Sequence, residues 1–175
     1  MLWFYDASDA IGQFMAAGGT VLDFIALLMF VMWMLIFERA FYYYRTHQKI
    51  ADDAIEQWNA RSDIKSWAAH AIREAIISRI SIGIDYNLNI IKTLVSLAPL
   101  MGLLGTVTGM IEVFNILAIT GGGDARSMAA GVGKATIPTM AGMVAALSGV
   151  FASSWLSRKA QREKDLIQDH LNIEH

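Results

Sequence analysis

The sequence predicts an all-α membrane protein with three transmembrane helices, an outside amino terminus, an inside carboxyl terminus, and second and third spans that extend into cytoplasmic helices. The 175-residue chain is 55% hydrophobic and only 17% charged, with a mean hydropathy of +0.41, which is too apolar for an ordinary soluble domain. Two stretches, residues 93–111 and 135–157, contain no Asp, Glu, Lys or Arg. Each is long enough to cross about 30 Å of hydrocarbon as a helix.

Residues 1–19 are predicted to form a periplasmic interfacial helix that leads into the first span. This segment contains Asp6 and Asp9 but no Lys or Arg. A signal peptide has a basic start, so we expect that the segment is not cleaved. Gly18 and Gly19 are expected to end this helix.

Residues 20–44 are predicted to be the first transmembrane helix. Its uncharged centre, residues 24–37, is shorter than the uncharged stretches of the other two spans. The segment ends in three tyrosines followed by Arg45, which is typical of a membrane interface. Asp23 follows Thr20 in a capping-box-like pattern, so we interpret it as a helix cap rather than a proton carrier.

Residues 45–89 are predicted to be a cytoplasmic helical region. Apolar residues recur there at helical spacing in two sets, which are separated at Ser62 and Asp63. The second set includes Trp67, Ile72, Ile76 and Ile80. We expect these helices to extend the membrane spans and to pack on one another.

Four further segments complete the predicted topology. They are a second transmembrane helix at residues 90–118, a periplasmic turn at 119–127, a third transmembrane helix at 128–157 and a cytoplasmic tail at 158–175. Seven basic residues lie in residues 45–92 and four follow the third span, whereas the amino-terminal segment has none and the turn has only Arg126. The positive-inside rule therefore places the amino terminus outside.

The composition excludes several functions. Without cysteine, the chain has no disulfide scaffold, thiolate zinc site, iron–sulfur cluster or cysteine nucleophile. A net charge of −2 and a pI of about 6.0 argue against nucleic-acid binding. His47 and His70 have no second ligand at helical spacing, so no metal site is predicted. Residues 131–136 (GVGKAT) resemble a phosphate loop but lack its first glycine and the Ser or Thr after the lysine. We predict no cofactor and no catalytic residue.

Small residues recur three and four positions apart in the second and third spans. They are Gly102, Gly105 and Gly109 in the second span, and Gly142, Ala146 and Gly149 in the third. Such spacing allows helix backbones to approach closely, because lipid gives no hydrophobic drive for helix pairing. The pattern alone fits an oligomeric helix array and packing within one chain equally well.

Glu112 and Lys134 are a candidate intramembrane ion pair. Each lies 11 residues from Gly123 in the predicted turn, which is about 16 Å along its helix at 1.5 Å per residue. Residues equally far from a turn between antiparallel helices lie at similar depth. An unpaired charge at that depth is costly, so the two are expected to pair.

Thr106 and Thr139 are also expected at nearly one depth, because they lie 17 and 16 residues from Gly123. A threonine can satisfy its hydroxyl on its own helix, but two threonines at one depth favour a polar lining. At about 100° per residue, one face of the second span collects small and mildly polar residues. These candidate pore-lining residues, together with Thr139, are Pro99, Gly102, Thr106, Gly109 and Val113.

Pro99 and Pro138 are the only prolines, and both lie inside predicted spans. Each removes a backbone hydrogen bond and frees a carbonyl, which is tolerated where a neighbouring helix or water provides a partner. We expect a helix kink at both. A kinked packing helix and a water-accessible pore wall both remain open.

Residues 97–110 (LAPLMGLLGTVTGM) and 131–146 (GVGKATIPTMAGMVAA) resemble the MotA/TolQ/ExbB proton-channel family, and are most similar to short-form ExbB proteins of TonB systems. The resemblance implies a ring, usually a homopentamer, in the inner membrane of a Gram-negative bacterium. The ring would surround the single transmembrane helices of an ExbD-like dimer, and protons would pass an aspartate of that partner. Motion would then reach a TonB-like protein.

The resemblance also bears on individual residues. Thr106 and Thr139 match the pore-lining threonines of the family. Lys134 stands where many ExbB and TolQ proteins carry a glutamate, and Glu112 stands where others are neutral. The charges are interpreted as exchanged between helices, so that a paired structural or gating site is preserved.

The implied function is that of a stator-like proton-channel subunit, not an enzyme, which energises TonB-dependent import of iron-siderophores, haem or vitamin B12. One alternative is a TolQ-like subunit that serves envelope integrity. Another is a structural membrane scaffold, in which the threonines and prolines are packing details. A secondary transporter is less suitable, because it normally shows inverted repeats and more spans.

Overall fold

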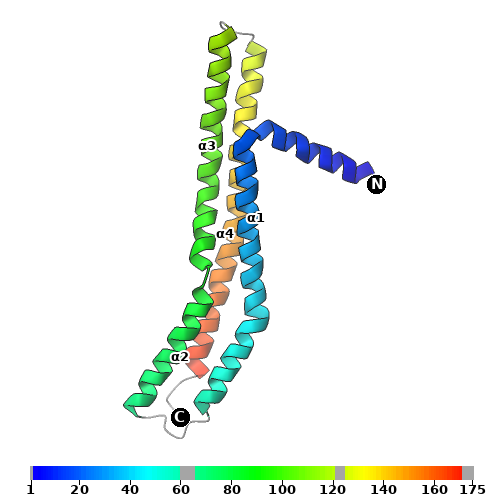
Figure 1. The fold of residues 1–175 in the computed structure, drawn as a ribbon. Helices are drawn as coiled ribbons and strands as arrows, with labels where there is room; N and C mark the ends of the chain where they lie inside the picture. Colours follow the sequence, from blue (N-terminus) through cyan, green and yellow to red (C-terminus); the bar gives the residue numbers. More distant parts are fainter. Residues whose placement is uncertain (1, 60–65, 121–124, 171–175) are drawn as a thin grey trace. The chain divides into compact units, whose positions relative to one another are not determined.

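The computed structural model describes residues 2–59, 66–120 and 125–170, and every regular element in these ranges is an α-helix (Figure 1). The helices are α1 (Leu2–Asn59), α2 (Trp67–Asp85), α3 (Leu88–Thr120) and α4 (Ala125–His170). Three stretches are long and apolar enough to cross a membrane, namely Asp9–Tyr44, Trp67–Ile119 and Met128–His170. The predicted all-α, three-span fold class is confirmed, while the orientation and the membrane borders stay predictions.

The chain packs as two compact units, which are described separately. The first unit contains Met1–Trp33 and Thr93–Val150, and the second contains Met34–Lys92 and Phe151–His175. Helices α1, α3 and α4 each contribute one part to either unit, whereas α2 belongs to the second unit alone.

In the first unit, α1 bends sharply at Gly19. The backbone of Gly19 has φ 63° and ψ −166°, a left-handed conformation that a residue with a Cβ rarely adopts. Figure 1 shows the amino-terminal part of α1 turning away from the rest of the helix at this point. The predicted break after Gly18 and Gly19 is therefore confirmed. Ile11 and Phe14 are exposed on the amino-terminal part, and its location at the membrane interface stays a prediction.

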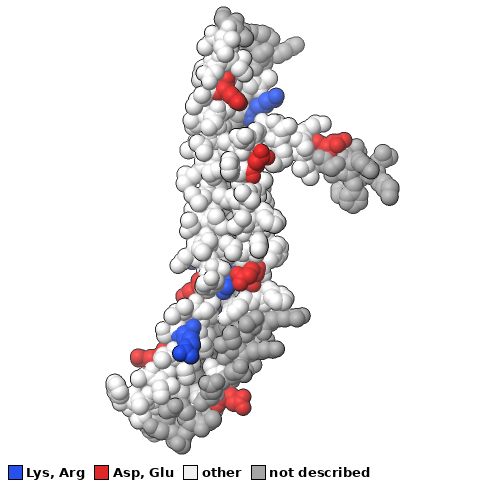
Figure 2. Space-filling view, in the orientation of Figure 1, with Lys and Arg blue, Asp and Glu red and all other residues white. Residues whose placement is uncertain are grey.

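The core of the first unit combines alanines of α3 and α4 with larger apolar side chains of α1, such as Leu22 and Ile25. Met32, Ala98 and Ala145 have no exposed surface, and Leu28 and Met29 of α1 pack against the alanines of α3 and α4. The outer faces carry large exposed apolar side chains, such as Phe30, Leu100 and Val144. Figure 2 shows a broad belt of this unit without charged side chains on the face in view. Such a surface needs lipid or other protein against it.

The second unit contains the break between α2 and α3. Helix α2 begins after Ser66, whose Oγ accepts a hydrogen bond of 3.1 Å from the Ala69 amide. It ends at Asp85, because Asn87 adopts a positive φ of 62° that no α-helix can contain. The amides of residues 87 and 88 therefore do not reach back to the carbonyls of Gly83 and Ile84, as they would in a continuous helix.

Two side chains of α1 donate hydrogen bonds to these carbonyls. Arg39 donates from Nη1 to the Gly83 oxygen at 3.2 Å, and the Tyr43 hydroxyl donates to the Ile84 oxygen at 2.8 Å. Both side chains are buried. The end of α2 is thus capped from another helix.

The predicted apolar face of α2 is correct in part. Ile80 is buried and Ile72 and Ile76 are half-buried, whereas Trp67 is 86% exposed. The packed face is centred on Ala69, Ile80 and Ile84, and Trp67 lies about 200° around the helix from Ala69. The predicted separation at Ser62 and Asp63 falls outside the described residues.

Candidate functional site

Helices α3 and α4 approach each other closely in the first unit through glycines of α3. A Cβ placed on Gly102 would lie 3.0 Å from the Pro138 carbonyl oxygen and 3.0 Å from the Thr139 Cα. A Cβ on Gly105 would clash with the Pro138 ring, and one on Gly109 would lie 2.7 Å from the Ala135 Cβ. The three glycines therefore all face α4 of the same chain.

The glycines of α4 serve the same packing in the other direction. A Cβ on Gly142 would lie 2.6 Å from the Ala98 carbonyl oxygen, and one on Gly149 would lie 2.6 Å from Val95 and 2.7 Å from Met32. All four predicted packing glycines, 105, 109, 142 and 149, thus lie at contacts within one chain. A role for them between copies stays a prediction.

Thr139 lies beside Gly102, which is one helical turn before Thr106 in α3. The Thr139 hydroxyl donates across the helix pair to the Gly102 carbonyl at 2.8 Å. In an α-helix that carbonyl is the backbone partner of residue 106. The Thr106 hydroxyl donates to the Leu103 carbonyl of its own helix at 2.7 Å. Each hydroxyl oxygen keeps lone pairs that can accept a further hydrogen bond.

The remaining candidate pore residues are either buried or half-buried in the single chain. Val113 is buried against Gly131 of α4. Pro99 and Thr106 are half-buried. Gly102, Gly109 and Val113 therefore pack against α4 of the same chain. That the whole set lines a shared pore stays a prediction. Helices α3 and α4 continue through both prolines.

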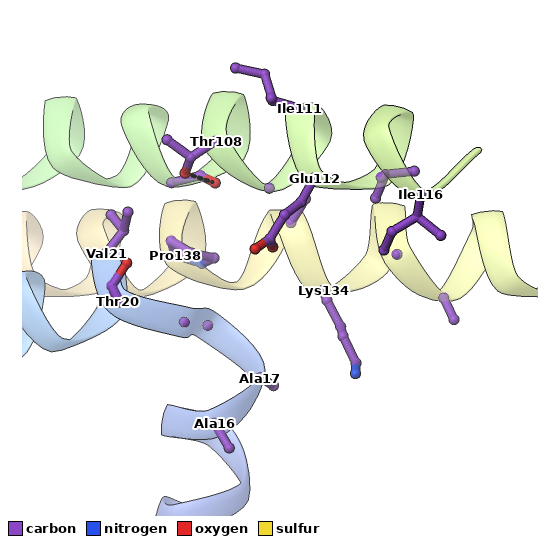
Figure 3. A pocket seen from close by; sticks show the side chains of 18 residues that line it. Ala16, Ala17, Thr20, Val21, Thr108, Ile111, Glu112, Ile116, Lys134 and Pro138 are labelled. Atoms are coloured by element: carbon purple, nitrogen blue, oxygen red, sulfur yellow. Dashed lines mark hydrogen bonds between the residues drawn. The ribbon is translucent and has the colours of Figure 1, made fainter. Parts of the chain in front are cut away.

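Glu112 and Lys134 line one cavity, together with residues 16–21 at the bend of α1 (Figure 3). No ion pair joins the two side chains in the described part of the chain, and Figure 3 shows that they diverge. Equal distance from the turn sets the level of each residue, but the rotation of each helix sets its direction. Glu112 adjoins Val113 and Lys134 adjoins Ala135, which both face the neighbouring helix, so the charged side chains flank that interface.

A buried charged group in the second unit was not predicted. Arg39 is 4% exposed, pairs with both carboxylate oxygens of Glu38 at 2.9 Å, and has its guanidinium 4.9 Å from the ring centres of Tyr42 and Tyr86. The signal in the sequence was an adjacent acid and base, Glu38 and Arg39, inside an otherwise apolar and aromatic run. Such a pair suits a buried arginine with a cation–π partner.

The comparison with known families decides the classification. Residues 44–169 match the model of the MotA/TolQ/ExbB proton channel family, which is most of the chain and includes both helices that carry the threonines. The chain belongs to this family. As a family member with three helices able to cross a membrane, it is a membrane protein. The family predicted from the sequence is therefore confirmed.

Several relatives are ExbB proteins. The chain is 52% identical over 61 residues to a putative biopolymer transport protein ExbB-like 1 of Synechocystis, which covers 33% of the chain and 24% of that protein. It is 33% identical over 84 residues to the biopolymer transport protein ExbB of Helicobacter pylori, covering 48% of the chain and 58% of that protein. It is 39% identical over 77 residues to exbB1 of Vibrio cholerae, covering 43% and 34%. The chain spans less than two thirds of each relative's length.

Proposed function

We propose that this family member is a stator-like proton-channel subunit of a Gram-negative inner membrane, which works with an ExbD-like partner to energise TonB-dependent import of iron-siderophores, haem or vitamin B12. The observation that carries the proposal is the family match over residues 44–169. Relatives named as biopolymer transport proteins support an ExbB-like role over a TolQ-like one.

The surface of the first unit supports an assembly of several copies. Six large apolar side chains of α3 and α4 are exposed in the single chain, namely Leu103, Val107, Phe114, Met140, Val144 and Leu147. In a ring, some of these side chains would contact other copies and the rest would contact lipid. The partner's single helices would occupy the centre, and the pentameric state is part of the proposal.

The two threonines are suited to conducting protons through water but not to binding a proton themselves. Hydroxyl groups can relay hydrogen bonds in a water-filled passage, but they do not titrate near neutral pH. We therefore assign the titrating carboxylate to the ExbD-like partner, and give Thr106 and Thr139 the task of holding water at one level of the passage. The amino terminus would lie in the periplasm, and residues 45–89 and 158–175 in the cytoplasm.

Proton flux in liposomes tests the proposal. The chain and its ExbD-like partner are reconstituted together and separately, a membrane potential is imposed, and a trapped pH-sensitive dye reports proton entry. Flux is expected only with both proteins present. Thr106→Val should reduce it by about tenfold or more, as expected when a hydrogen bond to a moving charge is lost.

Thr136→Val is the matched control. Its hydroxyl donates to the Gly133 carbonyl at 2.7 Å, which is the same local bond that Thr106 makes to Leu103. The two substitutions therefore remove equivalent bonds, each of which lies within a single helix. Equal flux in the Thr106→Val and Thr136→Val proteins would refute the pore assignment, and flux from the chain alone would refute the need for a partner.

A further inference from the structure

Charged side chains mark one end of the apolar part of the first unit. The charge-free stretch of α3 ends at Glu112, that of α4 starts after Lys134, and that of α1 starts after Asp23. The 19 charge-free residues 93–111 of α3 measure about 28 Å as a helix, close to the hydrocarbon thickness of a bilayer. Glu112 and Lys134 therefore stand where acyl chains meet lipid headgroups.

The cavity of Figure 3 lies at this level. It has a volume of about 780 Å³, is open on one side, and is lined by the bend of α1, two glycines of α3 and the first turns of α4. Most of its walls are Ala, Gly, Pro, Val and Ile. Its volume is within the usual range of roughly 300–1,000 Å³ for small-molecule sites.

Glu112 and Lys134 give this cavity two charges of opposite sign. Both side chains are exposed to the cavity, they diverge, and neither forms an ion pair within the ranges that the structure describes. Charges that do not neutralise each other are costly near hydrocarbon. A ligand that carries both an anion and a cation would satisfy the two at once.

We propose that this cavity binds the headgroup of an ethanolamine phospholipid, with the phosphate on Lys134 and the ammonium on Glu112. A primary ammonium donates up to three hydrogen bonds and suits a carboxylate, whereas a choline group donates none. A glycerol headgroup offers Glu112 no cation. The acyl chains would follow the exposed apolar side of α3, which continues from Ile111 to Val107. The proposal requires only that the helices cross a bilayer, so it does not depend on proton conduction.

Native mass spectrometry of the purified wild-type protein tests the proposal. The protein is titrated with phosphatidylethanolamine, phosphatidylcholine and phosphatidylglycerol that have identical acyl chains, and with glycerophosphoethanolamine, which has none. Phosphatidylethanolamine is expected to bind about tenfold more tightly than the other two lipids, the value of one charged hydrogen bond. The soluble headgroup should bind more weakly still.

Two charge-neutralising variants locate the site. Lys134→Gln should reduce binding of both phosphatidylethanolamine and phosphatidylglycerol, because both carry a phosphate. Glu112→Gln should reduce binding of phosphatidylethanolamine only. Lys92→Gln and Glu74→Gln, which make the same chemical changes at exposed positions outside the cavity, should leave the affinities unchanged.

The results can overturn the proposal in distinct ways. Equal affinity for the three lipids would reject recognition of the ammonium, and equal affinity for the soluble headgroup would reject a lipid as the occupant. Unchanged lipid binding in both cavity variants would reject the site. If Lys134→Gln and Glu112→Gln instead altered the number of chains in the assembly, the charges would belong to a contact between copies.

Discussion

The two units of the chain hold their helices together by different means. In the first unit, α3 and α4 meet through Gly102, Gly105, Gly109 and Gly142, and their backbones come into direct contact. In the second unit, α1 meets the end of α2 through the long side chains of Arg39 and Tyr43, which bond to backbone carbonyls. The first interface depends on glycines, which have no side chain. The second depends on the side chains of Arg39 and Tyr43.

The difference follows from the solvent that each interface replaces. Between lipid-exposed helices, burying apolar side chains gains little over lipid, so close backbone packing provides the attraction. Where a helix ends, its last carbonyls need donors, and a buried guanidinium or hydroxyl provides them. The first interface is therefore sensitive to added volume, and the second is sensitive to the loss of a donor.

The largest expected effect comes from adding one methyl group to the first interface. In Gly142→Ala, the new Cβ would lie 2.6 Å from the Ala98 carbonyl oxygen and 3.1 Å from the Gly102 Cα. Both are backbone atoms that cannot move aside by a rotamer change. We expect a loss of about 3 kcal/mol of stability, measured by thermal unfolding in detergent through the intrinsic tryptophan fluorescence.

Gly133→Ala is the control on the same helix. A Cβ on Gly133 meets nothing within 4 Å. This substitution should be neutral or stabilise the protein by up to about 1 kcal/mol, because alanine favours helix more than glycine. Equal melting temperatures for the two variants would show that close packing does not hold α3 to α4.

The next effect is expected at the second interface. Arg39→Ala removes the donor to the Gly83 carbonyl and two cation–π contacts, with Tyr42 and Tyr86. We expect a loss of about 2 kcal/mol. The local signal is hydrogen exchange at the Tyr86 amide, which closes the last turn of α2 by donating to Ile82 at 3.1 Å.

Faster exchange at Tyr86 should follow Arg39→Ala but not Arg79→Ala, which removes an exposed arginine of α2. Arg39→Lys should restore only part of the protection, because an ammonium lacks the planar fork that pairs with both Glu38 oxygens. Unchanged protection in Arg39→Ala would mean that the end of α2 needs no cap from α1.

The sequence was informative where structure depends on composition and spacing along one helix. The charge-free stretches predicted the spans, the glycine spacing predicted close packing, and equal distances from the turn placed Thr106 and Thr139 at one level. The rotation of one helix against another is set by packing at each contact, which spacing does not encode. For this reason Glu112 and Lys134 were placed at the right level but expected to point at each other. The Arg39 cap was missed because it joins residues 44 positions apart.

A smaller effect is expected at the hydrogen bond from the Thr139 hydroxyl to α3. Thr139→Val keeps the shape of the side chain but removes the donor to the Gly102 carbonyl. Such bonds between membrane helices contribute about 0.6 kcal/mol on average and up to about 1.7, so we expect a loss of about 1 kcal/mol. Thr139→Ser should retain most of the stability, and Thr136→Val should cost less than Thr139→Val. A loss as large as that of Gly142→Ala would make the hydroxyl, rather than the glycines, the main attachment between the two helices.

The smallest effect is expected at an ion pair near the surface of the second unit. Lys164 Nζ lies 2.6 Å from Asp85 Oδ2, which is shorter than any bond of Arg39, but the Asp85 side chain is 54% exposed. Water and salt screen such a pair, so Asp85→Asn should cost only about 0.5 kcal/mol, and high salt should abolish the difference. The pair and the Arg39 group both involve the end of α2, which makes them a direct test of burial against distance. If Asp85→Asn destabilised the protein as much as Arg39→Ala, the length of a contact, and not its shielding from water, would determine how much it stabilises the end of α2.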